Sequence, residues 1–227
     1  GEGIEQSLPS VKKAESVQPE SVGAIVAQTK TDPNPFVPYL NSLHNRSAAN
    51  ENALAESQAR NPFFCYIQVP HPIADIIHSM LTGEEKKHVV LTGHAGDGKS
   101  TIAVEVFKRI ADMTANQPLP RSLKRREDLG PISLIKDFSE WSPLERTDLM
   151  NEMFNSDNSR FLLISNTGTL LDTFKFHEKA RGGNWVGVES CLLGSMNSLE
   201  PALVTLQDVK FILVNVAMMD NLIIARS

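Results

Sequence analysis

One octapeptide restricts the fold more than any other part of the sequence. It is Gly93-His94-Ala95-Gly96-Asp97-Gly98-Lys99-Ser100, which matches the pattern G-x-x-x-x-G-K-[ST] at every fixed position. The apolar run 88–92 precedes it, and a segment with apolar residues at 102, 106 and 110 follows it. The sequence therefore predicts a strand, a glycine-rich loop and an amphipathic helix, which is the opening unit of an α/β nucleotide-binding fold.

Each residue type in the octapeptide suits the binding of phosphate. Glycines let the loop curl so that successive N–H groups point inward, and the helix that follows adds the positive end of its dipole. A lysine at position 99 reaches the β- and γ-phosphates of ATP, and the Ser100 hydroxyl ligates Mg²⁺. His94 and Asp97 are expected to face solvent or neighbouring loops. The alternative is a glycine-rich turn without a ligand. The predicted nucleotide-binding residues are Gly93, His94, Ala95, Gly96, Asp97, Gly98, Lys99, Ser100 and Thr101.

The remaining chain predicts further alternation of strands and helices. Apolar runs without alternation predict buried strands at 132–135, 161–165 and 209–216. Helices are expected at 72–82, between Pro72 and Gly83, at 143–155 after a capping box, and at 170–180. The run 63–67 is either a strand or a packed linker. The fold class is thus α/β, a three-layer P-loop NTPase core with a mostly parallel sheet covered on both faces.

Composition limits the class of protein further. The chain has 227 residues, of which 41% are hydrophobic and 22% charged, enough for a sizeable core. A net charge of −5 argues against a polycationic nucleic-acid coat. We expect an extended and helical N-terminal arm with a short helix over 1–60, and a core over 61–227 that is truncated at its C-terminus. Two cysteines and no long apolar stretch suit a reducing cytoplasm without a membrane span.

Phosphoryl transfer also requires an acid near the metal, and Asp137 is the best candidate because it follows the strand 132–135. Ser100 and Asp137 are the expected Mg²⁺ ligands. Glu140 could polarise the attacking water, although Ser139 and Glu140 could instead form only a turn. Lys136 is an awkward neighbour for a catalytic acid. The competing assignment moves the acid to Asp172 or Glu189, neither of which ends an apolar strand.

Two asparagines and one basic cluster leave alternatives open. Asn166 follows the strand 161–165, where a polar residue can orient water, but an asparagine before Gly168 also suits a strand-end turn. Asn215 competes for the same role. The segment 121–126 contains Arg121, Lys124, Arg125 and Arg126. A solvated loop is the default interpretation of this cluster, and contact with a DNA backbone is the alternative.

Three segments together resemble the DptF family, the ATPase-like component of a bacterial restriction system that depends on DNA phosphorothioation. They are Leu91–Ser100, Lys136–Ser139 and Leu163–Gly168, and the resemblance extends from about Asn34 onward. It implies an AAA-like ATPase core, with Asp137 as the Walker B acid and Asn166 as the sensor-type residue. It also implies antiphage defence against DNA lacking the sulfur-modified backbone, together with companion proteins DptG and DptH. The sequence departs from the pattern in lacking an Asp-Glu pair after the strand 132–136.

Three functions are compatible with these features. The first is a probable ATPase that acts on DNA, directly or through partners. The second is a nucleotide-gated scaffold that binds ATP with little turnover and assembles partner proteins. The third, a small-molecule kinase, ranks last because no Arg-rich lid segment is present in the sequence.

Overall fold

The computed structural model of the chain describes residues 34–43 and 55–219. The chain divides into two compact units, residues 1–41 and 42–227. In the first unit, the described residues lie mainly in α2 (Phe36–Ser42), so the expected N-terminal arm is helical at this point. The short helix expected before residue 60 is described only as α3 (Ala55–Ala59), which belongs to the second unit, and residues 47–54 lie outside the described part.

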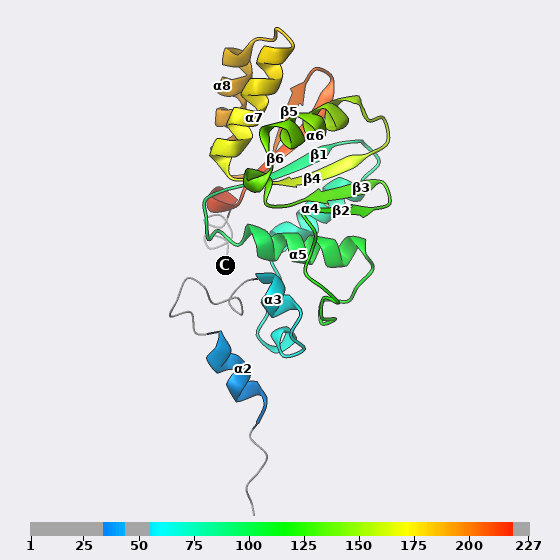
Figure 1. The fold of residues 1–227 in the computed structure, drawn as a ribbon, viewed down its shortest axis with the longest axis vertical. Coiled ribbons are helices and arrows are strands. Elements are labelled where there is room, and N and C mark those ends of the chain that lie inside the picture. The colour runs from blue at the N-terminus through cyan, green and yellow to red at the C-terminus, as the bar shows by residue number, and fades with distance from the viewer. Residues whose placement is uncertain (1–33, 44–54, 220–227) are drawn as a thin grey trace, which may run out of the picture. The chain divides into compact units, whose positions relative to one another are not determined.

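A six-stranded mixed sheet forms the centre of the second unit (Figure 1). Its strand order is β2-β3-β4-β1-β6-β5. The four inner strands run parallel, and the edge strands β2 and β5 are antiparallel to their neighbours. The mostly parallel sheet is thereby confirmed. The strands are β1 (His88–Thr92), β2 (Arg126–Leu129), β3 (Ile132–Ile135), β4 (Arg160–Ile164), β5 (Ala202–Leu206) and β6 (Val209–Asn215).

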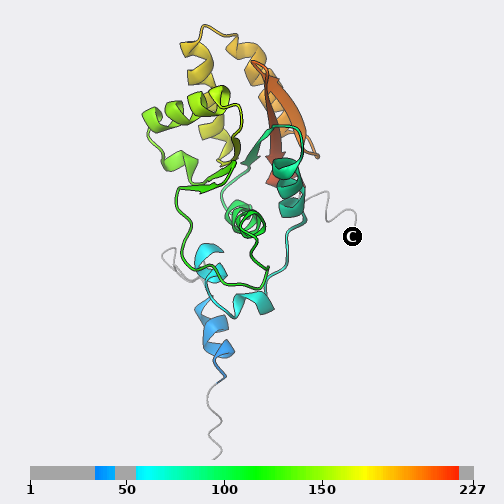
Figure 2. The ribbon, with the colours of Figure 1, turned by 90° about the vertical axis from the view of Figure 1, so that its right-hand side faces the viewer.

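Helices cover both faces of this sheet and complete a three-layer α/β architecture. Residues Val89 and Leu91 of β1 pack into a core with α4 and α5, whereas Val90 packs into a second core with α6, α7 and α8. Figure 1 shows α5 on one side of the sheet and α6–α8 on the other, and Figure 2 shows α5 nearly end-on. The helices are α4 (Pro72–Thr82), α5 (Lys99–Ile110), α6 (Pro143–Asn155), α7 (Thr167–Ala180) and α8 (Trp185–Met196).

Local capping explains why several helices begin where the sequence predicts. Pro72 occupies the first turn of α4, and Gly83 ends the helix. Ser142 accepts a hydrogen bond from the Glu145 N–H while Glu145 accepts one from the Ser142 N–H, so the capping box before α6 is present. These start signals act within a few residues, and the bounds predicted for α4 and α6 are confirmed.

Other elements differ from the expectations. The run 63–67 is the packed linker and not the strand: Phe64–Tyr66 form a 3-10 turn, η2, between α3 and α4, and Phe64 packs against the core. Helix α7 begins at Thr167, three residues before the predicted start, because Asn166 caps it. The sequence did not predict β2, α8 or β5. Strands β2 and β5 lie at the sheet edges, where exposed polar residues interrupt the apolar runs by which the inner strands were recognised.

Candidate functional site

The carboxyl ends of four parallel strands lie along one edge of the sheet. The central strand β1 is flanked by β4 and β6, with Leu91 opposite Ile164 and Thr92 opposite Asn215. Strand β3 follows on the far side of β4. Because ligands of open α/β sheets bind outside the carboxyl ends of the strands, this edge is the natural place for a site. The glycine-rich loop, Asp137, Asn166 and Asn215 all lie where these strands end.

The glycine-rich loop connects β1 directly to α5. Gly96 and Gly98 have φ angles of 89° and 78°, in the left-handed region that favours glycine. A Cβ atom at either position would meet nothing within 4 Å, so the requirement for glycine there is conformational and not steric. Gly98 is the N-cap of α5, and no side chain caps this helix end. The first N–H groups of α5 are therefore left for an anionic ligand or water.

Two side chains of the loop fold back onto its own backbone. The Asp97 carboxylate accepts a hydrogen bond from the His94 N–H at 2.5 Å, and the Lys99 ammonium donates to the His94 carbonyl. His94 is exposed, as expected, and Asp97 is partly exposed. The Asp97 carboxylate thus satisfies a backbone donor three residues away in its own loop. Burial lowers the pKa of Lys99 from its ordinary value, and the charge of Asp97 opposes this effect.

A pocket of about 370 Å³ opens at the loop. Residues 95–101 line it, so most of the predicted nucleotide-binding residues share one cavity. Ala55 and Gln58 of α3 form another part of the wall. This contribution from α3 was not predicted, since no local pattern indicates that the short helix packs against α5. The volume lies within the range of about 300–1,000 Å³ that is usual for small-molecule sites.

The candidate acid Asp137 lies two residues after the end of β3, and its carboxylate is not free. Its backbone has a φ angle of 52°, and Asp137 Oδ2 lies 3.3 Å from the ammonium of Lys136. The same ammonium forms an ion pair with Glu56 of α3. Burial opposes the charge of Lys136, but the hydrogen bond with Glu56 and the charges of both carboxylates raise its pKa overall. Glu140 is exposed in the 3-10 turn η3 (Phe138–Glu140), so the turn considered for it is present.

The competing acids lie elsewhere in the fold. Asp172 is in α7 and lines a different pocket with Pro143 and Arg146, and Glu189 is in α8. Neither follows a strand at the carboxyl edge of the sheet. The topology thus favours Asp137 as the acid that could reach a metal at the loop.

The two asparagines occupy different environments. The Asn166 side-chain oxygen accepts a hydrogen bond from the Thr169 N–H at 2.8 Å, which makes Asn166 the N-cap of α7 and supports the turn interpretation. The amide nitrogen of Asn215 donates to the Met196 carbonyl at 2.7 Å. Asn215 Oδ1 is buried without a hydrogen-bond partner among the described residues, and it would lie 3.6 Å from a Cβ placed on Gly93. Of the two, Asn215 has the uncommitted acceptor beside the loop.

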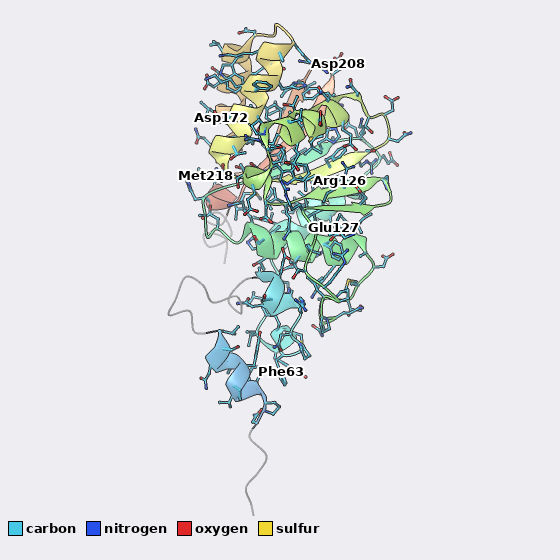
Figure 3. The ribbon with its side chains drawn as sticks, viewed as in Figure 1. Phe63, Arg126, Glu127, Asp172, Asp208 and Met218 are labelled. Carbon is cyan, nitrogen blue, oxygen red and sulfur yellow. The ribbon has the colours of Figure 1, made fainter. Side chains whose placement is uncertain are left out.

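Most of the basic segment 121–126 is an exposed loop, as the default interpretation has it, and its three arginines are paired with other side chains. Arg121 forms two hydrogen bonds with Glu127, and Arg126 forms two with Glu152 of α6. Figure 3 labels Arg126 and Glu127, the first two residues of β2. The Arg125 guanidinium lies over the ring of Trp141. Internal pairing accounts for these three arginines, so the alternative of a DNA-backbone contact gains no support here.

Few protein side chains are available as ligands for a divalent cation at this site. Within residues 34–43 and 55–219, no group of three or more His, Cys, Asp or Glu side chains could hold a metal ion. Magnesium fits such a site nonetheless, because it is usually held by one or two protein oxygens, the phosphates and water. Ser100 is exposed at the start of α5, and Asp137 retains one carboxylate oxygen apart from the one facing Lys136. These two residues could hold the ion.

Comparisons with known proteins leave the family open. No protein-family model matches the chain. Searches among curated proteins and among solved structures gave no significant match either. Within the described part of the chain, no helix is long and apolar enough to cross a membrane.

Proposed function

We propose that the chain is an ATP-binding module of the P-loop NTPase class, with Mg²⁺ as its metal. One observation carries the proposal: the glycine-rich loop leaves the central strand β1 at the carboxyl edge and opens directly into the uncapped end of α5. A phosphate chain seated there would meet the N–H groups and positive dipole end of α5. Lys99 would exchange its contact with the His94 carbonyl for the β- and γ-phosphates.

Calorimetry of ATP binding by the wild-type chain and by Lys99→Ala tests this proposal. The substitution removes a charge-assisted contact worth about 1.5–3 kcal/mol, so affinity should fall about 10- to 150-fold. Lys124→Ala is the control, because Lys124 is an exposed lysine outside the glycine-rich loop and its ammonium has no ion pair among the described residues. Equal affinity of folded Lys99→Ala and wild type would exclude the loop as the phosphate site.

Whether the chain also hydrolyses ATP separates two versions of the proposal. Asp137 is our candidate for the metal-binding acid, and Glu140, three residues further on, is our candidate for activating water. In the first version the chain hydrolyses ATP, and in the second it is a nucleotide-gated scaffold with slow turnover. The pairing of Asp137 with Lys136 and the exposed turn position of Glu140 support the second version. A steady-state ATPase assay, with and without DNA, distinguishes a motor from such a switch.

The biological setting of the proposal rests on the resemblance to the DptF family. On that basis the chain would serve antiphage restriction of DNA lacking phosphorothioate, with proteins of the DptG and DptH kind as partners. The ion pairs of Arg121, Arg125 and Arg126 make partner proteins the better candidates for DNA contact. Co-purification of the chain with each companion, with and without ATP, tests this part separately from nucleotide binding.

A further inference from the structure

A single ammonium group joins two carboxylates from distant parts of the sequence. Lys136 forms an ion pair with Glu56 of α3 and lies 3.3 Å from Asp137 Oδ2. The side chains of Lys136 and Glu56 are each only 17% exposed, whereas that of Asp137 is 41% exposed. The pair on the α3 side is therefore sheltered from solvent, and the Asp137 side remains open to a competing cation.

Glu56 also fixes α3 to the rest of the unit. Its second oxygen accepts a hydrogen bond from the Leu123 N–H at 2.9 Å, and the Ala59 carbonyl at the end of α3 accepts one from the Leu119 N–H at 2.8 Å. Helix α3 in turn supplies Ala55 and Gln58 to the wall of the loop pocket. A continuous chain of contacts thus runs from the pocket wall through Glu56 and Lys136 to the candidate metal acid.

The charges in this chain compete with one another. Asp137 can interact with the Lys136 ammonium or with a divalent cation, but a cation at Asp137 would repel the ammonium toward Glu56. Removing Glu56 would leave Asp137 as the only carboxylate partner of Lys136 among the described residues. Removing Lys136 would leave a divalent cation without a competitor for the Asp137 carboxylate.

We propose that Lys136 is a positioning residue that couples the seating of α3 at the loop pocket to the occupation of Asp137 by Mg²⁺. This inference rests on the proposed ATP site. Lys136 is shared between both carboxylates in the absence of the cation and is transferred to Glu56 when Mg²⁺ takes Asp137. Coupling between two sites is reciprocal. Since Mg²⁺ at Asp137 shifts Lys136 toward α3, the contacts of Lys136 with α3 in turn alter the gain in ATP affinity that Mg²⁺ provides.

The test measures the dissociation constant of ATP without and with Mg²⁺ in the 227-residue chain. The quantity compared is the ratio of the constant without Mg²⁺ to the constant with Mg²⁺, which is the gain in affinity that Mg²⁺ provides. Mg²⁺ reduces the negative charge of ATP, so the ratio also contains a general charge effect, which the control Lys124→Met measures. Lys136→Met should raise the ratio about fivefold or more, and Glu56→Gln should lower it. Lys136→Arg, which keeps the charge, and the control Lys124→Met should both retain the wild-type ratio.

Hydrogen exchange of residues 55–59 gives a second measurement that does not depend on nucleotide. Exchange should be faster in Lys136→Met than in wild type, since α3 loses its tie to the sheet edge. Opposite shifts of the affinity ratio in Lys136→Met and Glu56→Gln, with the ratio unchanged in Lys124→Met, support the coupling, because loosening of the fold would move both variants in the same direction. An unchanged ratio, or two shifts of the same sign, overturns the coupling and leaves the proposed ATP binding unaffected. A wild-type chain that binds no ATP overturns the proposed function itself, and the coupling with it.

Discussion

The buried histidine at the start of β1 makes the stability of the fold sensitive to acid. His88 is fully buried, and its ring lies between two main-chain groups. Nε2–H donates to the Met153 carbonyl at 2.9 Å, and Nδ1 accepts from the Phe161 N–H at 3.2 Å. The hydrogen bond from Phe161 requires the neutral ring, because a protonated Nδ1 cannot accept it. Burial, assisted by the nearby charge of Lys86, lowers the pKa of His88 from 6.5 to about 4 despite the bond to Met153.

The size and sign of the effect follow from this difference in pKa. As pH falls below 6.5, the unfolded chain binds a proton at His88 while the folded chain does not, until the pH reaches about 4. Stability contributed by the neutral ring is thus present above 6.5 and is lost between 6.5 and about 4. At about 1.4 kcal/mol per pH unit, about 2 kcal/mol should be lost on going from neutral pH to about pH 5, and about 3 kcal/mol at most.

Urea denaturation of wild type and His88→Gln at about pH 7.5 and about pH 5 measures this contribution. His88→Gln should be less stable at the higher pH, but its stability should fall by about 2 kcal/mol less between the two. His177 adds to the acid sensitivity of both chains, because burial lowers its pKa as well, and the difference between variants removes that contribution. His78→Gln in α4 is the control. Equal pH dependence of wild type and His88→Gln would refute the argument.

Three further predictions concern the site and its surroundings. Asp137→Asn should retain ATP binding but reduce any ATP turnover at least about tenfold, since the metal loses its carboxylate; unchanged turnover in an ATPase assay would move the acid to Asp172. Asn166→Ala should cost about 1 kcal/mol of unfolding free energy by removing the cap of α7, with Asn166→Asp close to wild type in the same denaturation experiment. Arg126→Gln should lower the melting temperature by breaking the pair with Glu152, while the salt dependence of any DNA binding stays the same; a flatter dependence would restore the phosphate-contact alternative.

The sequence determined those features that depend on neighbouring residues. Signals a few residues long determine several features of the loop and the helices. They are the glycines that require left-handed backbone, the lysine and serine that follow them, and the helix starts at Pro72 and Ser142. The buried inner strands were also predictable, because strands covered on both faces consist of continuous apolar residues. These local rules sufficed to predict the α/β class and the loop.

The tertiary structure decided which side chains meet. Three arrangements show this. They are the ion pairing of the segment 121–126, the burial of Asn215 Oδ1 beside Gly93, and the sharing of Lys136 between Glu56 and Asp137. Each of them joins residues that the sequence separates widely or presents as simple neighbours. Their energies depend on burial and on charges brought together by the folded sheet, which no local pattern records. Whether the candidate acid is free or held by a lysine was therefore a property of the fold.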